Sequence, residues 1–201
     1  MNIKIFLIGL VISFLSFLQL NAQSKSDTYL NFGGGVAVEG NVGIPGINIA
    51  SDLNYYLNKS LSLNPSLILF QSTDFPQKRT SENPYPSLAD KSTALLMSLG
   101  FQADILKTND GFRMGLAAGP SYHVGVDKYF IGYTINENNV LVSNGHERIS
   151  RSQLGLITQL SFDWEGNQAD RKHAIDLSVT GYDNYFGWHA MLTYKVGFLL
   201  K

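Results

Sequence analysis

The sequence has no cysteine and few charged residues, and its leading apolar run is short. Without cysteine, the chain forms no disulfide and carries no lipid-modified N-terminal cysteine. The formal net charge of −1 gives no reason to expect a nucleic acid as partner. A chain of 201 residues with this composition is expected to form one domain, and its stability has to come from something other than disulfides.

The first 22 residues have the layout of a secretory signal peptide. Lys4 precedes an apolar run from Ile5 to Leu18, and the small residue Ala22 provides the expected cleavage point. The alternative is a membrane-anchoring helix, but the run is shorter than the ~20 residues that a span needs. We therefore expect a signal peptide over residues 1–22 and a mature domain over residues 23–201.

The segment from Phe186 to Leu200 shows the pattern that dominates the chain, because every second residue is apolar or aromatic. A period of two residues is typical of a β-strand, whose successive side chains leave on opposite faces. At fifteen residues the segment exceeds the roughly five or six that are usual in soluble sheets. Such a length suits a tilted strand that crosses a bilayer.

Eight segments of this kind follow one another, and their connections alternate between tight turns and longer loops. The predicted strands cover residues 29–38, 46–57, 60–70, 92–106, 112–126, 153–164, 175–180 and 186–200. An even number of strands with turns on one side and loops on the other is typical of outer-membrane barrels. We therefore predict an all-β fold, an eight-stranded antiparallel up-and-down transmembrane β-barrel. A soluble lipocalin-like barrel is the alternative fold.

Local residues also predict where the strands turn or break. Asn58-Lys59 and Thr108-Asn109-Asp110-Gly111 are turn sequences, since Asn, Asp and Gly tolerate positive φ. Pro65 is expected at a bulge or a non-bonded position, and Pro120 at another bulge, because proline donates no ladder hydrogen bond. Gly33-Gly34-Gly35 indicates close strand packing rather than a phosphate-binding loop, since no lysine or helix pattern follows it.

Aromatic residues are expected to form a girdle at each rim of the barrel. One girdle is predicted from Trp164, Phe112, Tyr55 and Phe198, and the other from Tyr122, Tyr182, Phe186 and Trp188.

The inward face of the predicted barrel carries polar and charged residues. The charged or titratable members are Asp52, Asp104, Arg113, Asp163, Asp176, His189 and Lys195. An eight-stranded barrel is just wide enough for side chains to fill, and buried charges need partners. Arg113 and Lys195 are therefore expected to pair with aspartates in a polar plug. The alternative is a narrow channel in which these charges select the solute.

Three features resemble the small outer-membrane β-barrel proteins of the Bacteroidetes type, called porin-family or PorT-like proteins. They are the leader ending Asn21-Ala22-Gln23, the strand-turn-strand from Leu53 to Leu63, and the ending Tyr194-Lys195-Val196-Gly197-Phe198. The resemblance spans nearly all of the mature chain and implies an outer-membrane location without a shared substrate. The terminal Leu200-Lys201 departs from the final aromatic residue of many such barrels.

An enzymatic alternative rests on Ser121 and His123, which share one strand face. Some eight-stranded outer-membrane barrels deacylate lipid A with Ser, His and Glu, and Glu137 or Glu147 would be the third member here. The order Ser-x-His reverses the His-x-Ser of that family, so we expect no enzyme. His146-Glu147 and His173 lack metal-ligand spacing, and neither a metal nor another cofactor is expected.

The remaining function class is a non-enzymatic structural, surface-binding or assembly scaffold. Its expected surroundings are outer-membrane lipid and lipopolysaccharide. The regions 74–91 and 127–150 are predicted to be long loops that bind a protein or glycan. Within the second region, Lys128–Ile135 and Val140–Ser143 have the pattern to extend the flanking strands beyond the membrane.

Overall fold

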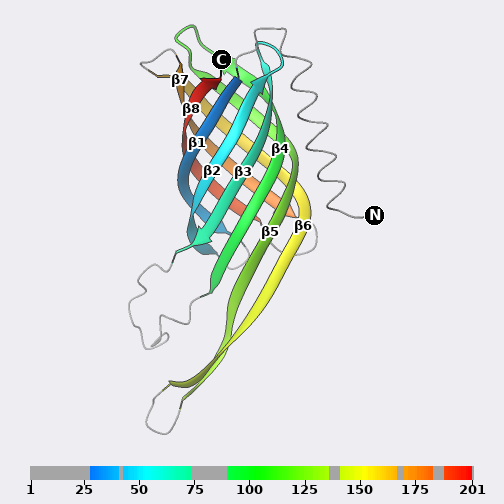
Figure 1. Ribbon diagram of the computed structural model, residues 1–201, viewed down its shortest axis with the longest axis vertical. Coiled ribbons are helices and arrows are strands. Elements are labelled where there is room, and N and C mark those ends of the chain that lie inside the picture. The colour runs from blue at the N-terminus through cyan, green and yellow to red at the C-terminus, as the bar shows by residue number, and fades with distance from the viewer. Residues whose placement is uncertain are drawn as a thin grey trace.

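The protein is a closed barrel of antiparallel strands in chain order. The computed structural model describes residues 28–40, 43–73, 90–135, 141–166, 170–182 and 188–200. The strands are β1 (Thr28–Glu39), β2 (Ile44–Tyr56), β3 (Leu61–Ser72), β4 (Lys91–Lys107), β5 (Arg113–Ile135), β6 (Leu141–Glu165), β7 (Arg171–Tyr182) and β8 (His189–Leu200). Pairing of β1 with β8 closes the ring (Figure 1), which confirms the predicted up-and-down barrel. The expected signal peptide lies outside the described residues.

Side chains alternate between the interior and the outer surface along each strand, as the two-residue period predicts. Large apolar side chains stand on the outer surface, among them Leu154 at 73% exposed and Leu156 at 66%. The interior holds many polar residues instead, including Asn31, Asn48 and Thr180. No helix among the described residues is long and apolar enough to cross a membrane.

Close approach of β1 to β8 depends on two inward-facing glycines. A methyl group at Gly33 would lie 2.0 Å from the carbonyl oxygen of Tyr194, and one at Gly35 would lie 1.9 Å from that of Leu192. The methyl group at Gly33 would also lie 2.7 Å from Cγ of Lys195. The glycines thus leave room for the seam that closes the barrel and for the aliphatic chain of Lys195, in agreement with the packing interpretation of Gly33-Gly34-Gly35.

The turn connecting β2 to β3 and the turn connecting β4 to β5 lie at one end of the barrel, which we call the turn end. The side-chain oxygen of Asn58 accepts hydrogen bonds from the backbone N–H groups of Ser60 and Leu61, each at 2.9 Å. Gly111 has φ +86°, which confirms the second predicted turn. There the Thr108 hydroxyl donates to the Asp110 carboxylate and lowers the pKa of that carboxyl group.

Pro65 and Pro120 each interrupt the pairing with one neighbouring strand without shifting its register. The β2–β3 ladder runs from Asp52↔Ser66 to Tyr55↔Leu63 in one register, with Pro65 in the gap. Pro65 therefore occupies a non-bonded position on that side. The prediction of a bulge at Pro120 was wrong, because the β4–β5 register is the same on both sides of it and shifts only between Asp104 and Leu106.

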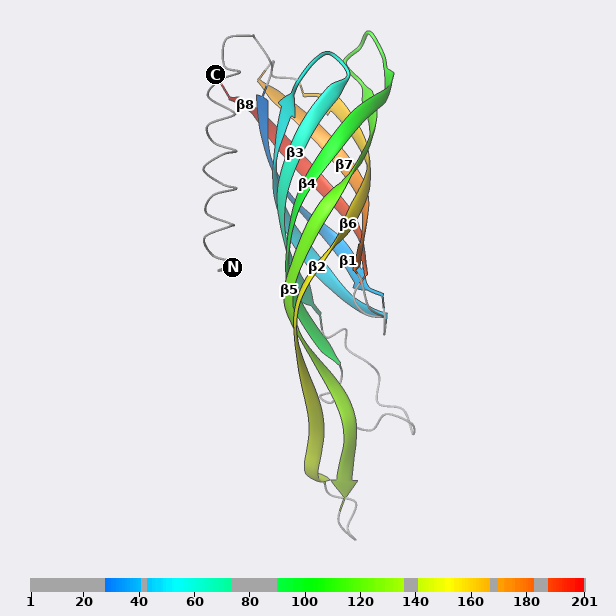
Figure 2. The same cartoon turned by 90° about the vertical axis from the view of Figure 1, so that its right-hand side faces the viewer.

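Strands β5 and β6 continue past the opposite end of the barrel, which we call the loop end. Pairing of β5 with β4 ends at Lys128, and pairing of β6 with β7 ends at Gly155. Beyond Lys128 the two strands pair only with each other, and they form a twisted two-stranded extension (Figures 1 and 2). We call residues 129–135 and 141–147 the ribbon.

The ribbon corrects the prediction of a loop over residues 127–150. Among these residues 127–135 and 141–150 are strand, because backbone pairing such as Tyr129↔Glu147 and Thr134↔Ser143 continues between them. The expected strand extension of Lys128–Ile135 is confirmed. Of the other predicted loop, residues 74–89 lie outside the described residues, while Lys91 already belongs to β4.

Substitution of Gly35 by alanine tests the closing seam. Gly35→Ala is expected to lower the free energy of unfolding by about 1–3 kcal/mol, because the methyl group meets the backbone of Leu192. Gly181→Ala is the matched control, since nothing lies within 4 Å of its added methyl group. Denaturant titrations of the refolded proteins measure both changes, and equal stability of the two variants would contradict the packing role of Gly35.

Candidate functional site

The interior near the turn end contains an ionic cluster centred on Lys195 of β8. Its ammonium group contacts the carboxylate of Asp52 on β2 and lies 2.5 Å from that of Asp176 on β7. Asn31 on β1 donates to Asp52 over 2.5 Å. Lys195 is therefore held by two carboxylates from different strands, and these three charged groups are all buried.

Two further ion pairs lie at the same end of the interior. Arg113 is 3.5 Å from Asp104, and Lys172 is 3.6 Å from Asp163. The ring of Tyr56 lies between these pairs, with the Arg113 guanidinium 4.7 Å and the Lys172 ammonium 5.9 Å from its centroid. These contacts join the pairs into one network, because a cation above an aromatic face is attracted by the ring electrons.

The network contains residues that sequence reasoning assigned elsewhere. Lys172 falls between the predicted strands 153–164 and 175–180, whereas it is a buried residue of β7. Alternation along the strand could have placed Lys172 in the interior. Asp176 and Ser178 face inward, so Ala174 and Lys172, two and four residues before Asp176, face inward as well. His189, predicted for the same polar set, lies away from these ion pairs.

An apolar layer lies in the interior between the ionic cluster and the loop end, on the side formed by β8 and β1 to β4. The side chains that form it are Ala37, Ala50, Ile68, Phe70, Ala94, Leu96 and Met191. In β2, β4 and β8 these residues lie farther from the turn end than Asp52, Asp104 and Lys195. The polar pattern of the inward face had not indicated such a layer. The neighbouring interior positions of β5 and β7 are polar and buried, among them Ser121, Ser178 and Thr180.

Two histidines lie beside this layer. The His189 ring is 5.0 Å from the Phe70 ring and 5.3 Å from the His123 ring. His123 in turn lies 4.8 Å from Tyr182. Neither histidine has a hydrogen-bonded ring nitrogen within the described structure. No group of three or more potential protein ligands for a metal ion occurs in the described part of the chain.

The Ser121 and His123 side chains do not form the hydrogen bond that a nucleophile and its base require. Both are buried inside the barrel, on the same strand. Glu147 lies on the ribbon, opposite Tyr129, and Glu137 is outside the described residues. The described geometry therefore gives the deacylase alternative no catalytic arrangement.

A third group of polar residues fills the interior at the loop end. Nε of Arg151 is 2.6 Å from the carboxylate of Asp127, and Nη2 of Arg151 donates to the hydroxyl of Tyr129 over 2.6 Å. Arg151 and Asp127 are both buried. From the turn end to the loop end, the interior thus changes from ionic to apolar and back to ionic.

Aromatic residues of the first predicted girdle lie near the turn end. The Trp164 ring stacks on His173, with 5.8 Å between centroids, and His173 is 2.6 Å from the Tyr194 hydroxyl. Phe198 is 41% exposed, while Tyr55 is only 6% exposed. Phe112 is half-buried beside the turn that precedes β5.

The second predicted girdle is divided between the two faces of the barrel. Trp188 is 44% exposed, and Tyr122 is half-buried, with its hydroxyl bonded to Ser152. The outward prediction for Tyr182 was wrong, because its ring lies against His123 in the interior. The physical reason is alternation, since Tyr182 follows the buried Thr180 by two residues. Phe186 lies outside the described residues.

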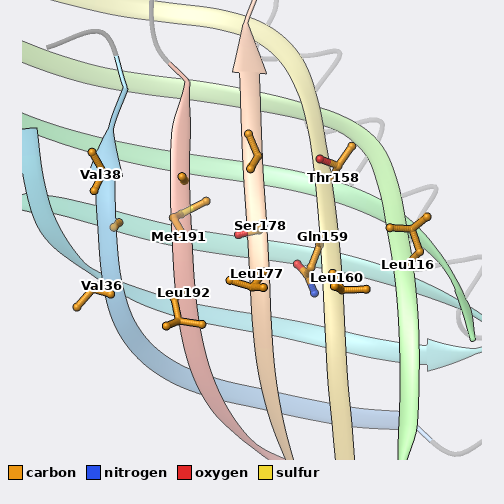
Figure 3. Close-up of a pocket in the computed structure, with 13 residues that line it drawn as sticks. Val36, Val38, Leu116, Thr158, Gln159, Leu160, Leu177, Ser178, Met191 and Leu192 are labelled. Carbon is orange, nitrogen blue, oxygen red and sulfur yellow. The ribbon is translucent and has the colours of Figure 1, made fainter. Parts of the chain in front are cut away.

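A pocket of about 410 Å³ lies across five adjacent strands, on the outward apolar face (Figure 3). One row of its lining consists of residues paired directly across the strands: Val36, Leu192, Leu177, Leu160 and Leu116. The next row contains Ala190 and Thr158, whose smaller side chains do not fill the surface, so a depression forms there. Its lining belongs mostly to the outer surface, so it is not a continuation of the interior site.

Comparison with solved structures identifies similar barrels. Neisserial surface protein A has a TM-score of 0.61 and 11% identity, covering 86% of this chain and 97% of that one. Ail, the attachment invasion locus protein of Yersinia pestis, has a TM-score of 0.53 and 10% identity, covering 88% of this chain and 100% of that one. A major outer membrane protein from Thermus thermophilus has a TM-score of 0.57 and 15% identity, covering 88% of this chain and 100% of that one.

Ail also has a similar structure in complex with the heparin analogue sucrose octasulfate, with a TM-score of 0.51 and 12% identity. No family model and no curated protein matches the chain by sequence. At these identities the likeness shows the fold, an eight-stranded barrel of the kind found in small outer-membrane proteins.

Loss of the buried cation tests the ionic cluster. Lys195→Met is expected to lower the free energy of unfolding by about 3–5 kcal/mol, because Asp52 and Asp176 lose the positive charge between them. Lys59→Met removes an exposed lysine from the β2–β3 turn and is expected to change stability by less than about 0.5 kcal/mol. Urea unfolding of both variants provides the measurement, and similar losses would contradict the central role of Lys195.

Proposed function

We propose that the protein is an outer-membrane β-barrel that acts as a non-enzymatic surface-binding scaffold. The observation that carries this proposal is the distribution of side chains. Large apolar residues cover the outer surface, while buried ion pairs lie inside. A bilayer stabilises this arrangement, because the apolar face meets lipid and the closed ladder satisfies the backbone hydrogen bonds.

The proposed orientation places the turn end in the periplasm and the loop end outside the cell. Short periplasmic turns and longer outer segments are typical of such barrels. Export by the signal peptide of residues 1–22 and membership of the Bacteroidetes porin-family or PorT-like group belong to the same proposal. The similar surface and outer-membrane proteins support the location, although their low identities establish only the fold.

The proposed binding surface is the ribbon with the rim around it. The interior is filled by the apolar layer and by paired charges, so it offers a solute little space. The ribbon instead projects from the barrel (Figure 2), and its residue Ile131 is 67% exposed. A rigid barrel that holds such a strand pair away from its rim suits the binding of a protein or glycan.

Two arginine substitutions separate a membrane barrel from a soluble one. Leu156→Arg is expected to destabilise the inserted protein by about 2–4 kcal/mol, since the charge enters the lipid-facing band. Ile131→Arg is matched in exposure, at 67% against 66%, but lies on the ribbon and should have little effect. Refolding into lipid vesicles, followed by urea titration and a gel comparing heated with unheated samples, measures both. Equal tolerance of the two substitutions would contradict insertion.

Planar-bilayer recordings test the closed interior against the narrow-channel alternative. The refolded wild-type protein is expected to give no stable conductance, because the side chains of the apolar layer and of the buried ion pairs occupy a narrow interior. Phe70→Ala with Leu96→Ala removes two of its buried side chains and should increase brief openings. Leu69→Ala with Leu95→Ala is the outward-facing control. Stable wild-type conductance would favour a channel and make Asp52, Asp104, Arg113 and Lys195 candidates for selectivity.

A further inference from the structure

Three basic residues form a row across adjacent strands at the loop end. Lys91 of β4 pairs directly with Lys128 of β5, and Lys128 pairs directly with Arg148 of β6. All three side chains are exposed. Neighbouring strands lie roughly 4.7–4.9 Å apart, so the row extends over about 10 Å. Like charges directly opposite each other repel, and an anion placed over them would remove that repulsion.

Two nearby acidic groups are occupied by other contacts, and Glu147 leaves β6 on the opposite face from Arg148. The Asp127 carboxylate pairs with Arg151 in the interior, and the Asp90 carboxylate accepts a hydrogen bond from the backbone N–H of Phe130 over 2.7 Å. Neither Lys128 nor Arg148 forms an ion pair with a carboxylate of the described residues. Lys91 has a further interaction of its own, so Lys128 and Arg148 are the principal residues of the row.

Along β6 the outward residues change stepwise from apolar to hydroxyl-bearing to basic as the strand approaches this row. Leu156 and Leu154 of β6 are exposed apolar residues, and Ser152 and Ser150 follow on the same face before Arg148. On the neighbouring strand, the Tyr122 hydroxyl bonds to Ser152. This order follows that of a membrane, in which the acyl chains give way to the polar headgroup and its phosphate.

The final layer beyond the basic row is aromatic. The rings of Phe130 and His146 lie 5.7 Å apart, edge to face, two residue pairs beyond Lys128 and Arg148. The row is therefore bounded by hydroxyl groups on one side and by aromatic rings on the other.

We propose that Lys128 and Arg148, with Lys91 beside them, bind the phosphate group of an anionic phospholipid at the rim of the barrel. This proposal rests on the insertion of the barrel into a membrane. The guanidinium of Arg148 has the fork geometry that matches phosphate oxygens, and Lys128 supplies a point charge next to it. The site fixes the depth of the barrel in the bilayer and holds the base of the ribbon against the membrane surface.

Native mass spectrometry of the refolded protein in dodecyl maltoside tests the site, with phosphatidylglycerol and phosphatidylcholine of identical acyl chains as probes. Phosphatidylglycerol is expected to bind more tightly than phosphatidylcholine. Lys128→Gln with Arg148→Gln should weaken phosphatidylglycerol binding roughly tenfold or more, since each basic residue contributes to attraction of anionic lipid. Binding of phosphatidylcholine should stay unchanged.

The matched control also removes one lysine and one arginine, but from separate exposed positions at the turn end. Lys59→Gln with Arg171→Gln should change phosphatidylglycerol binding less than about twofold, because Lys59 lies in the β2–β3 turn and Arg171 begins β7, which neighbours neither strand. Equal weakening by the two double variants would overturn the site. Displacement of the lipid by inorganic phosphate or sucrose octasulfate at equal concentration would overturn the assignment to a lipid.

The heated and unheated gel samples separate this proposal from the proposed function. A protein that shows no folded band and does not enter vesicles contradicts membrane insertion itself. A protein that inserts normally, yet binds both lipids equally, contradicts only the site for an anionic lipid.

Discussion

Closure of β1 on β8 is the constraint on which the rest of the structure depends. Pairing from Thr28↔Leu200 to Glu39↔His189 gives the first and last strands a partner on both sides. The closed ladder satisfies backbone groups that would otherwise form an open sheet edge. It also separates two surfaces completely, so each side chain of the barrel wall lies either inside or outside. The glycines at 33 and 35 allow this seam to close without contact between side chains and backbone.

A closed eight-stranded ring leaves an interior of fixed and small width, and its side chains have to fit one another. The charged residues do so by sharing partners, as Lys195 does with Asp52 and Asp176. The apolar layer around Phe70 and Leu96 then separates this ionic end from the pair of Arg151 and Asp127. Such an interior suits a stable plug, which is why the proposed binding function is assigned to the outer surface at the loop end.

The loop end differs from the rest of the barrel because β5 and β6 extend beyond the neighbouring strands β4 and β7. The wall of the barrel ends where β4 and β7 end, while the ribbon continues with backbone pairing of its own. The basic row of Lys91, Lys128 and Arg148 lies at the base of the ribbon, where wall and extension meet. We infer that this junction positions the protein at the membrane surface and presents the ribbon beyond it.

The sequence by itself determined the strands, the antiparallel barrel and most of the inward and outward residues. These features follow from the two-residue alternation and from turn residues such as Asn58 and Gly111, which act locally. The same alternation could have placed Tyr182 in the interior, since Tyr182 lies on the same strand face as Thr180.

The tertiary structure alone decided which residues meet. Register is set between strands and not within one, so no pattern along a single strand joins Asp163 with Lys172 or aligns Lys128 with Arg148. The apolar layer was hidden for the same reason, because its members come from separate strands and become neighbours only when the ring closes. The length of the ribbon depended on where β4 and β7 stop, which is a property of the neighbours of β5 and β6 and not of their own sequences.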